Sequence, residues 1–351
     1  METLELPKNQ TLKQKQNNIL KKRINYFDIA KGLGILLMII GHMPIKNEYL
    51  KNFIFCFHMP LFFIISGYFF KHKDNKECLK NIFKKLIKPY IITCLAIIFY
   101  QVLKLLLNKN FIEIPNTLKT WGLASLYGSG SMQPFGIKYI GAIWFLLALA
   151  SATYIINNIY TNKYRNLLVI LISYIGYKTS KYIWFPFSIQ AGMVATIFMY
   201  VGIIIKEKDI LHKKLSVTTY IFIISITIFC IIYGGKLYMV SNIYKNGLLD
   251  IIGAISTSFL FIKLCMQIDT HSKHLKKPFI YIGKNSLICI CLHLFSLDCL
   301  HYSTLNKILT KIGLSNYTLN SIILNILWVL FMLLFIKLTL KAFDSIKRTL
   351  K

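Results

Sequence analysis

The sequence predicts an all-α, polytopic integral membrane protein with about ten transmembrane helices and both termini in the cytoplasm. Of its 351 residues, 55% are hydrophobic, and a mean hydropathy of +0.54 is too high for an ordinary soluble domain. Apolar runs that approach bilayer-spanning length recur along nearly the whole chain. The basic residues gather in alternate connections between these runs, as the positive-inside rule requires.

The apolar runs define the predicted spans. A membrane helix needs about 20 mainly apolar residues, and the fifth and sixth runs depart most from this ideal because one is short and the other follows Pro186. The predicted spans are 24–43, 52–70, 88–107, 139–156, 166–178, 187–205, 216–234, 247–266, 279–300 and 320–340.

The charge distribution sets the predicted topology. Most of the 42 Lys and Arg residues lie in the N-terminal tail and in every second connection, which places these segments in the cytoplasm. Residues 1–23 predict a disordered basic tail, and residues 24–345 a single transmembrane domain. The net charge of +29 does not indicate nucleic-acid binding, because the basic residues flank apolar spans and suit anionic lipid instead.

Two further features limit the possible functions. The longest outer connection, 108–138, contains the Gly- and Ser-rich stretch 127–134, which predicts a flexible loop. None of the eight cysteines has zinc-ligand spacing with a histidine, so we expect buried free thiols and no metal site.

The first predicted span carries the clearest candidate chemistry. Asp28 and Lys31 lie near one end, and His42 lies at the other. Eleven positions separate Lys31 from His42, so a helix places both on one face, roughly 16 Å apart along its axis. Asp28, three residues before Lys31, can pair with it. Ionisable groups inside a membrane are costly, and each is therefore a functional candidate.

Two more histidines could share a reaction centre with His42. His58 enters the second span at a depth similar to that of His42, and His293 lies deep in the ninth span. A histidine in such a centre would suit a general base. Each histidine could instead be a structural residue that hydrogen-bonds a neighbouring helix, and the residues alone leave both interpretations open.

A lysine cluster closes the predicted cytoplasmic connection after the second span. Lys84, Lys85 and Lys88 have helical spacing and could bind phosphate groups as point charges. The alternative is that they only signal topology.

Several motifs resemble the integral-membrane acyltransferase 3 family, and more narrowly its fucose 4-O-acetylase-like branch. The resemblance covers residues 24 to about 340. It rests on Asp28…Lys31-Gly…Gly41-His42 and Phe57-His58-Met-Pro-Leu-Phe-Phe-Ile-Ile-Ser-Gly-Tyr68, and later on Trp144-Phe145-Leu146 and Ile282-Gly-Lys-Asn-Ser-Leu287 followed by His293.

The resemblance implies transfer of an acyl group, usually acetyl, from acyl-CoA to a carbohydrate hydroxyl. Acyl-CoA is then the donor substrate, a glycan is the acceptor, and no cofactor stays bound. We further expect a multi-pass protein of a plasma membrane that works beside polysaccharide biosynthesis proteins, and the Lys-, Asn- and Ile-rich composition indicates a bacterial one. Many members carry arginine where this chain has Lys31, which keeps the charge without the bidentate fork of arginine.

A mechanism follows as a hypothesis. Lys84, Lys85 and Lys88 hold the nucleotide of acyl-CoA, its pantetheine arm passes Lys31 along the first helix, and His42 is the general base. His58 orients His42 or holds the oxyanion, Asp28 fixes Lys31, and Trp144 forms a wall of the site. His293 either lines this cavity or makes a core hydrogen bond. Direct transfer and an acyl-histidine intermediate both remain open.

Two other functions also fit the composition. A transporter of a sugar, lipid or acyl group would use the same ionisable residues as a substrate or proton path. A structural or regulatory membrane scaffold would need no converging histidines.

Overall fold

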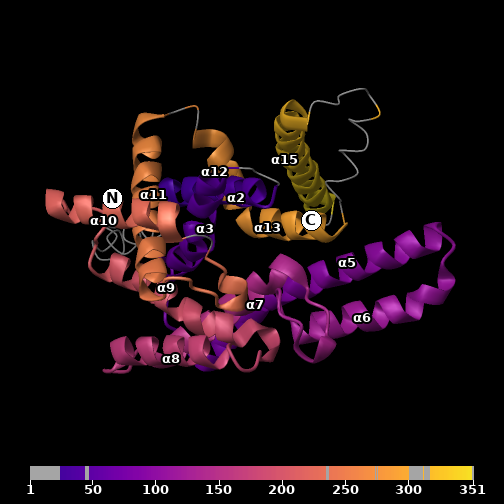
Figure 1. Ribbon diagram of the computed structural model, residues 1–351, viewed down its shortest axis with the longest axis horizontal. Coiled ribbons are helices and arrows are strands. Elements are labelled where there is room, and N and C mark those ends of the chain that lie inside the picture. Colours follow the sequence, from indigo (N-terminus) through magenta and orange to yellow (C-terminus); the bar gives the residue numbers. More distant parts are fainter. Residues whose placement is uncertain are drawn as a thin grey trace, which may run out of the picture.

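The chain folds into a bundle of helices (Figure 1). The computed structural model describes residues 24–43, 47–234, 237–272, 274, 276–299, 311 and 317–349. Within these residues every regular element is helical, apart from an isolated β-bridge between Tyr238 and Ile243. The predicted tail 1–23 lies outside the described residues.

A helix or a helix pair overlaps each predicted span. These are α2 (Asn25–Gly41), α3 (Glu48–Tyr68), α5 (Lys88–Leu107), α7 (Trp144–Ile159), α8 (Arg165–Thr179), α9 (Ile189–Glu207), α10 (Val217–Phe229), α11 (Leu248–His271), the pair α12 (Lys276–Lys284) and α13 (Ser286–Cys299), and α15 (Tyr317–Thr349). Within the described residues, six helices are long and apolar enough to cross a membrane, and a bent pair would make a seventh. The chain is thus a multi-pass membrane protein, and the count of ten stays a prediction.

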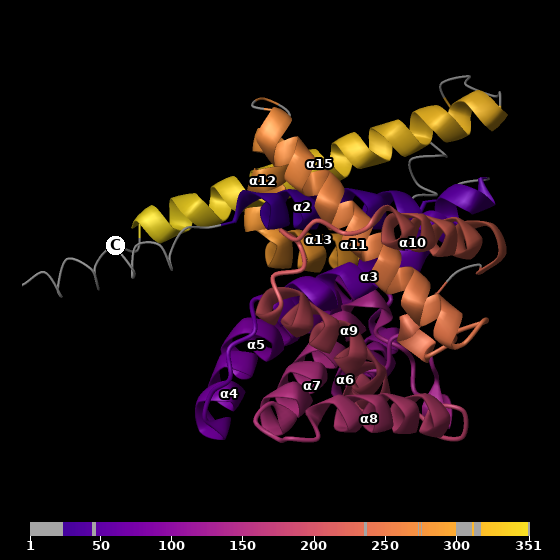
Figure 2. The ribbon, with the colours of Figure 1, turned by 90° about the vertical axis from the view of Figure 1, so that its left-hand side faces the viewer.

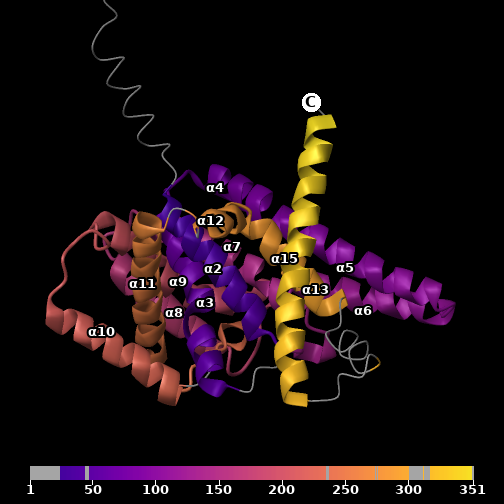
Figure 3. The ribbon, with the colours of Figure 1, turned by 90° about the horizontal axis from the view of Figure 1, so that it is seen from above.

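Two connections are more helical than the sequence predicts. The connection after α3 contains α4 (Asn75–Ile82), which continues through the π-helical turn η1 (Phe83–Ile87) into α5, so the lysine cluster lies inside one long helix and does not close a loop. The connection 108–138 contains α6 (Ile114–Tyr127), which runs beside α5, and the two extend together from the bundle (Figures 1 and 3).

The stretch 127–134, predicted to be flexible, is instead held by hydrogen bonds. The Ser188 hydroxyl donates to the Gly128 carbonyl at 2.7 Å, and the Ile140 N–H donates to the Ser129 carbonyl at 2.8 Å. Ser129 itself is buried. Gly128 has a φ of +70°, a conformation that glycine adopts without strain, so its role here is a tight turn after α6 and not flexibility.

The ninth predicted span is a broken helix and not a straight one. The pair α12 and α13 bends by 79° at Asn285. The Asn285 side-chain amide donates to the Tyr281 carbonyl at 2.9 Å, and the Cys289 N–H donates to the Asn285 carbonyl at 3.0 Å. Asn285 therefore ends one helix and starts the next, and α13 leaves in a new direction.

Glycines bring two pairs of helices into backbone contact. Where α3 crosses α9, a Cβ on Gly67 would overlap the Met199 carbonyl, and a Cβ on Gly202 would overlap the Ile64 carbonyl. Such small-residue crossings let membrane helices approach closely without apolar side chains between them. Each helix thus supplies the glycine that the backbone of the other requires.

The same arrangement joins α2 to α12, which lie together in Figure 2. A Cβ on Gly32 would overlap the Phe279 carbonyl, and a Cβ on Gly283 would overlap the Asp28 carbonyl. Gly283 lies two residues before the bend at Asn285, so this crossing fixes the point from which α13 departs.

We expect Gly67→Ala or Gly202→Ala to destabilise the protein, because the added methyl group meets a backbone that cannot move independently. The overlap should cost at least about 1–3 kcal/mol. The measurement is the thermal midpoint of the detergent-solubilised protein. Gly122→Ala in α6 is the control, because a Cβ there meets nothing within 4 Å. Equal stability of Gly67→Ala and Gly122→Ala would contradict this account.

Candidate functional site

Three histidines from three helices meet in the bundle. His42 at the end of α2 and His293 in α13 have ring centroids 5.3 Å apart, with the rings at 85°. The Phe55 ring of α3 lies 6.0 Å from His42 and 5.1 Å from His58, so it contacts both imidazoles. The bend between α12 and α13 allows His293 to reach this cluster.

A cavity of about 230 Å³, called here the reaction cavity, opens beside these rings. Its walls are mainly apolar, with His42, His58 and Ser131 among the few polar side chains. This is the usual character of a small-molecule site. Its lining comprises Met38, His42, Phe55, His58, Met59, Phe62, Gly130, Ser131, Ala142, Trp144, Phe145, Leu237, Tyr238, Met239, Val240, Ile290 and Leu294.

Backbone carbonyls set the tautomers of two histidines. The Nδ1 atom of His42 lies 3.1 Å from the Met38 carbonyl, and that of His58 lies 2.8 Å from the Ile54 carbonyl. Because a carbonyl oxygen only accepts hydrogen bonds, Nδ1 carries the proton in both rings. In the neutral imidazoles Nε2 then has a free lone pair, which is the form a general base requires.

His293 differs from the other two histidines in its hydrogen bonding. Its side chain is fully buried, and neither ring nitrogen has a hydrogen-bond partner among the described residues. A buried imidazole N–H without a partner is destabilising. His293 itself is not among the residues that line the reaction cavity, although Ile290 and Leu294 on either side of it are. Within the described residues, no group of three His, Cys, Asp or Glu side chains could hold a metal ion.

Trp144 lines the reaction cavity, and its position depends on Gly130. A Cβ on Gly130 would collide with both the Trp144 ring and the Val240 side chain. Sequence reasoning missed Gly130, Ser131 and the segment 237–240 as cavity residues. The Gly-Ser-Gly pattern at 128–130 predicts flexibility when the sequence is considered alone, because its packing partners are distant in sequence.

A second cavity, called here the basic cavity, has a volume of about 470 Å³. It lies where α3 ends and α4 begins, and its polar lining includes Lys71, Lys73 and Lys85. Of the three lysines predicted from the sequence, only Lys85 lines it. Lys84 and Lys88 are exposed on the same helix and are not among its lining residues.

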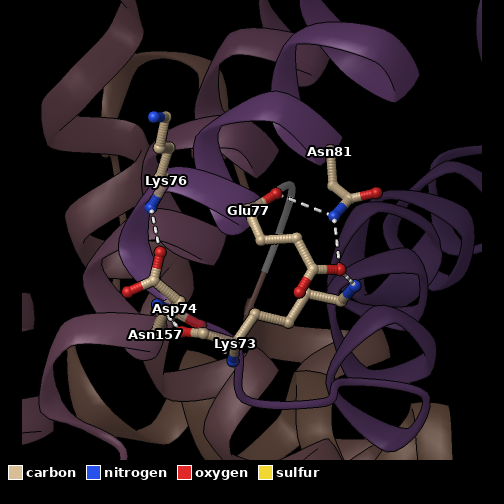
Figure 4. Close-up of polar contacts among 6 residues, drawn as sticks. All are labelled: Lys73, Asp74, Lys76, Glu77, Asn81 and Asn157. Atoms are coloured by element: carbon tan, nitrogen blue, oxygen red, sulfur yellow. Dashed lines mark hydrogen bonds and ion pairs between the residues drawn. The ribbon is translucent and has the colours of Figure 1, made fainter.

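One asparagine holds the edge of the basic cavity (Figure 4). The Asn157 side chain, buried at the end of α7, accepts from the Lys73 N–H at 3.1 Å and donates to the Lys73 carbonyl at 2.9 Å. The Lys73 ammonium pairs with Glu77, whose backbone carbonyl accepts from Asn81. The segment before α4 is thus fixed to α7, and Lys71 and Lys73 are held beside Lys85.

The two cavities follow one another along the same faces of α3 and α7. On α3, Phe62 lines the reaction cavity and Ser66 lines the basic cavity; on α7, Phe145 and Leu149 do the same. Each pair is four residues apart, which is about one helical turn, or roughly 6 Å. On both helices the two cavities are therefore about one turn apart, and the Phe62 and Phe145 rings, with centroids 6.0 Å apart, pack together where the reaction cavity ends.

Asp28 and Lys31 form an ion pair at 2.7 Å, as their spacing predicts. Asp28 is buried, and its backbone carbonyl is the atom that Gly283 of α12 approaches. Lys31 lines neither the reaction cavity nor the basic cavity. The pair therefore lies under the α2–α12 crossing, apart from both cavities.

Comparison with known proteins identifies the family. A family model described as an acyltransferase domain, of the acyltransferase 3 type, matches residues 24–340, a range that includes both cavities and all three clustered histidines. No curated protein and no solved structure gives a significant match. Because the family match spans most of the chain, this multi-pass membrane protein belongs to the acyltransferase 3 family.

Proposed function

We propose that the protein transfers an acetyl group from acetyl-CoA to a hydroxyl of a carbohydrate at the outer face of a bacterial plasma membrane. The observation that carries this proposal is the alignment of a lysine-lined cavity with a histidine-lined cavity along α3 and α7. A nucleotide thioester has matching chemistry, with phosphates at one end and a reactive acyl group at the other. The finer resemblance to fucose 4-O-acetylase-like proteins supports acetyl as the acyl group.

The basic cavity suits the nucleotide end of the donor. Lys71 and Lys85 supply positive charge, and Lys73 adds charge that Glu77 partly offsets. Lys84 and Lys88 extend the positive surface on the exposed side of the same helix. The pantetheine arm would then lie between α3 and α7. This route replaces the one along α2 past Lys31, since Lys31 lines neither cavity.

His42 has the tautomer that a general base requires, with the proton on Nδ1 and a free lone pair on Nε2. Its Nε2 lone pair takes the proton of the acceptor hydroxyl as that oxygen attacks the thioester carbonyl carbon. The carbon–sulfur bond then breaks, and the thiolate of CoA leaves and takes up the proton. The products are an acetyl ester and free CoA, so atoms and charge balance without another reactant.

The other two histidines receive different roles from those expected. Neutral His58 has its N–H committed to Ile54, so it cannot donate to an oxyanion and instead accepts a hydrogen bond from the acceptor. His293 is not among the lining residues of the reaction cavity, but its ring lies against that of His42 and it has no committed nitrogen among the described residues. We assign it as the oxyanion donor, a role in which its ring must turn into the cavity when the donor binds. Lys31 and Asp28 become positioning residues, because they lie under the helix crossing that precedes His293.

The acceptor is a glycan hydroxyl. The apolar aromatic walls formed by Phe55, Phe62 and Trp144 suit the acetyl group and the flat face of a sugar ring. Proteins of polysaccharide biosynthesis would supply the glycan, and the surrounding bilayer is the remaining partner.

The direct test gives purified protein radiolabelled acetyl-CoA and a mixture of surface glycans. We expect label in the glycan fraction, and about 10²–10⁴-fold less with His42→Asn, because asparagine retains a donor toward Met38 and lacks the base. His212→Asn, at an exposed site, is the control. Full transfer by His42→Asn would contradict the assignment, and transport of intact substrate without label transfer would identify a transporter.

Lys85→Gln should weaken acetyl-CoA binding about tenfold, the equivalent of roughly 1.4 kcal/mol, because a cation facing the phosphates is lost. Equilibrium dialysis with labelled acetyl-CoA measures this without an acceptor. Lys80→Gln is the matched control, an exposed lysine on α4 that does not line the basic cavity. Equal affinities of the two variants for acetyl-CoA would show that the donor does not bind in the basic cavity.

His293→Phe should lower the rate of transfer about 10²–10³-fold and leave acetyl-CoA affinity unchanged, since an aromatic ring stays at this position while both ring nitrogens, and with them the N–H donor, are lost. The measurement is single-turnover label transfer beside equilibrium dialysis. A loss of binding that matches the loss of rate would instead indicate a packing role for His293.

A further inference from the structure

A separate apolar cavity, called here the lateral cavity, lies between α8, α9 and the start of α11. Its volume is about 230 Å³. Ile170, Tyr174 and Leu248 in its lining are 59%, 56% and 65% exposed, so the cavity opens onto an exposed apolar surface, of the kind that contacts lipid in a membrane protein. The lining comprises Ile170, Ser173, Tyr174, Tyr177, Val194, Ile197, Tyr244, Gly247, Leu248 and Ile251.

One polar group in the lateral cavity lacks a partner. The Tyr244 hydroxyl is buried and makes no hydrogen bond within the described part of the chain. Its ring packs edge-to-face on Tyr177, with centroids 6.0 Å apart. By contrast, the Ser173 hydroxyl is 3.0 Å from that of Thr196. An oxygen of a molecule inside the cavity would supply the bond that Tyr244 lacks.

Two cations lie against the tyrosines of this cavity. The Lys178 ammonium is 5.6 Å from the ring centroid of Tyr174, and the Lys181 ammonium is 4.5 Å from that of Tyr177. No carboxylate in the described residues forms an ion pair with either lysine. Positive charge therefore lies beside an apolar cavity that faces lipid.

We propose that the lateral cavity holds one acyl chain of an anionic membrane phospholipid. The chain fills the apolar cavity, the phosphate lies beside Lys178 and Lys181, and the Tyr244 hydroxyl donates to the ester region between them. Each part of the lipid meets a complementary group: hydrocarbon meets aliphatic and aromatic side chains, the ester meets an unpaired donor, and the phosphate meets lysines. A neutral lipid without a phosphate would lack the last of these contacts, and the ammonium group of a zwitterionic phospholipid would offset the charge of its phosphate.

The bound lipid has a consequence for the reaction cavity. The segment 237–247 lines both: Tyr238 and Val240 face the reaction cavity, and Tyr244 faces the lateral cavity. The bridge between Tyr238 and Ile243 and a hydrogen bond of 3.4 Å from Asn242 to the Gly176 carbonyl hold this segment together and to α8. The lipid therefore steadies one wall of the reaction cavity, a consequence that rests on the proposed function.

The test is photolabelling in nanodiscs with a phosphatidylglycerol that carries a diazirine on its acyl chain, followed by peptide mapping. We expect label in 170–177 and 244–251 above that in α10, a largely exposed apolar helix that serves as the reference for nonspecific contact. Equal labelling of α10 would overturn the proposal. Binding is read out here without catalysis, so failure of the proposed function would not affect the result.

Variants identify the headgroup contact. Lys178→Gln with Lys181→Gln should lower specific labelling about tenfold or more, and Tyr244→Phe severalfold, because charge and hydrogen bonding are removed separately. Lys163→Gln is the matched control, since Lys163 lies 4.8 Å from the ring of Tyr164, a tyrosine that, unlike Tyr174 and Tyr177, lines none of the three cavities. Unchanged labelling in the double variant would overturn the proposal. Stronger displacement by a polyprenyl phosphate than by phosphatidylglycerol would make a carrier lipid the occupant and contradict it as well.

Discussion

The arrangement of the helices depends on backbone contacts made at glycines. Where α3 crosses α9 and where α2 crosses α12, each helix presents a glycine to a carbonyl of the other, and any side chain at these points would separate them. The first crossing holds the helix that carries His58. The second fixes the end of α12, from which the bend at Asn285 directs α13 and His293 toward His42. The histidine cluster is thus a consequence of these contacts.

The middle of α3 and its C-terminal end lie in different electrostatic environments. Near the middle of α3, aromatic and aliphatic side chains surround the histidine cluster, and carbonyls of Met38 and Ile54 fix the protons of His42 and His58. At the C-terminal end, lysines surround a larger cavity whose edge is fixed to α7 by Asn157. In the proposed function, the anionic part of the donor therefore binds at the lysines and proton transfer takes place at the histidines. This arrangement keeps the phosphate charges away from the general base, His42.

Much of the fold was predictable, and the site was predictable in part. Hydropathy predicted the positions of the helices, because a helix that crosses the apolar core of a bilayer needs a long run of apolar residues. It could not show the bend at Asn285, since both halves are apolar, nor that Gly128 and Gly130 pack tightly, because their neighbours are distant in sequence. Asp28 and Lys31 pair as their spacing predicts, but spacing along one helix cannot show that Lys31 lines neither cavity. Likewise, only the three-dimensional arrangement distinguishes Lys85 from Lys84 and Lys88.

The central claim is that the reaction cavity and the basic cavity are two ends of one donor site. A structure of the protein with a nonhydrolysable thioether analogue of acetyl-CoA tests it most directly. We expect the nucleotide beside Lys71 and Lys85, the pantetheine arm between α3 and α7, and the acyl carbonyl next to His42 and His293. An analogue bound along α2 against Lys31, or outside both cavities, would contradict the account.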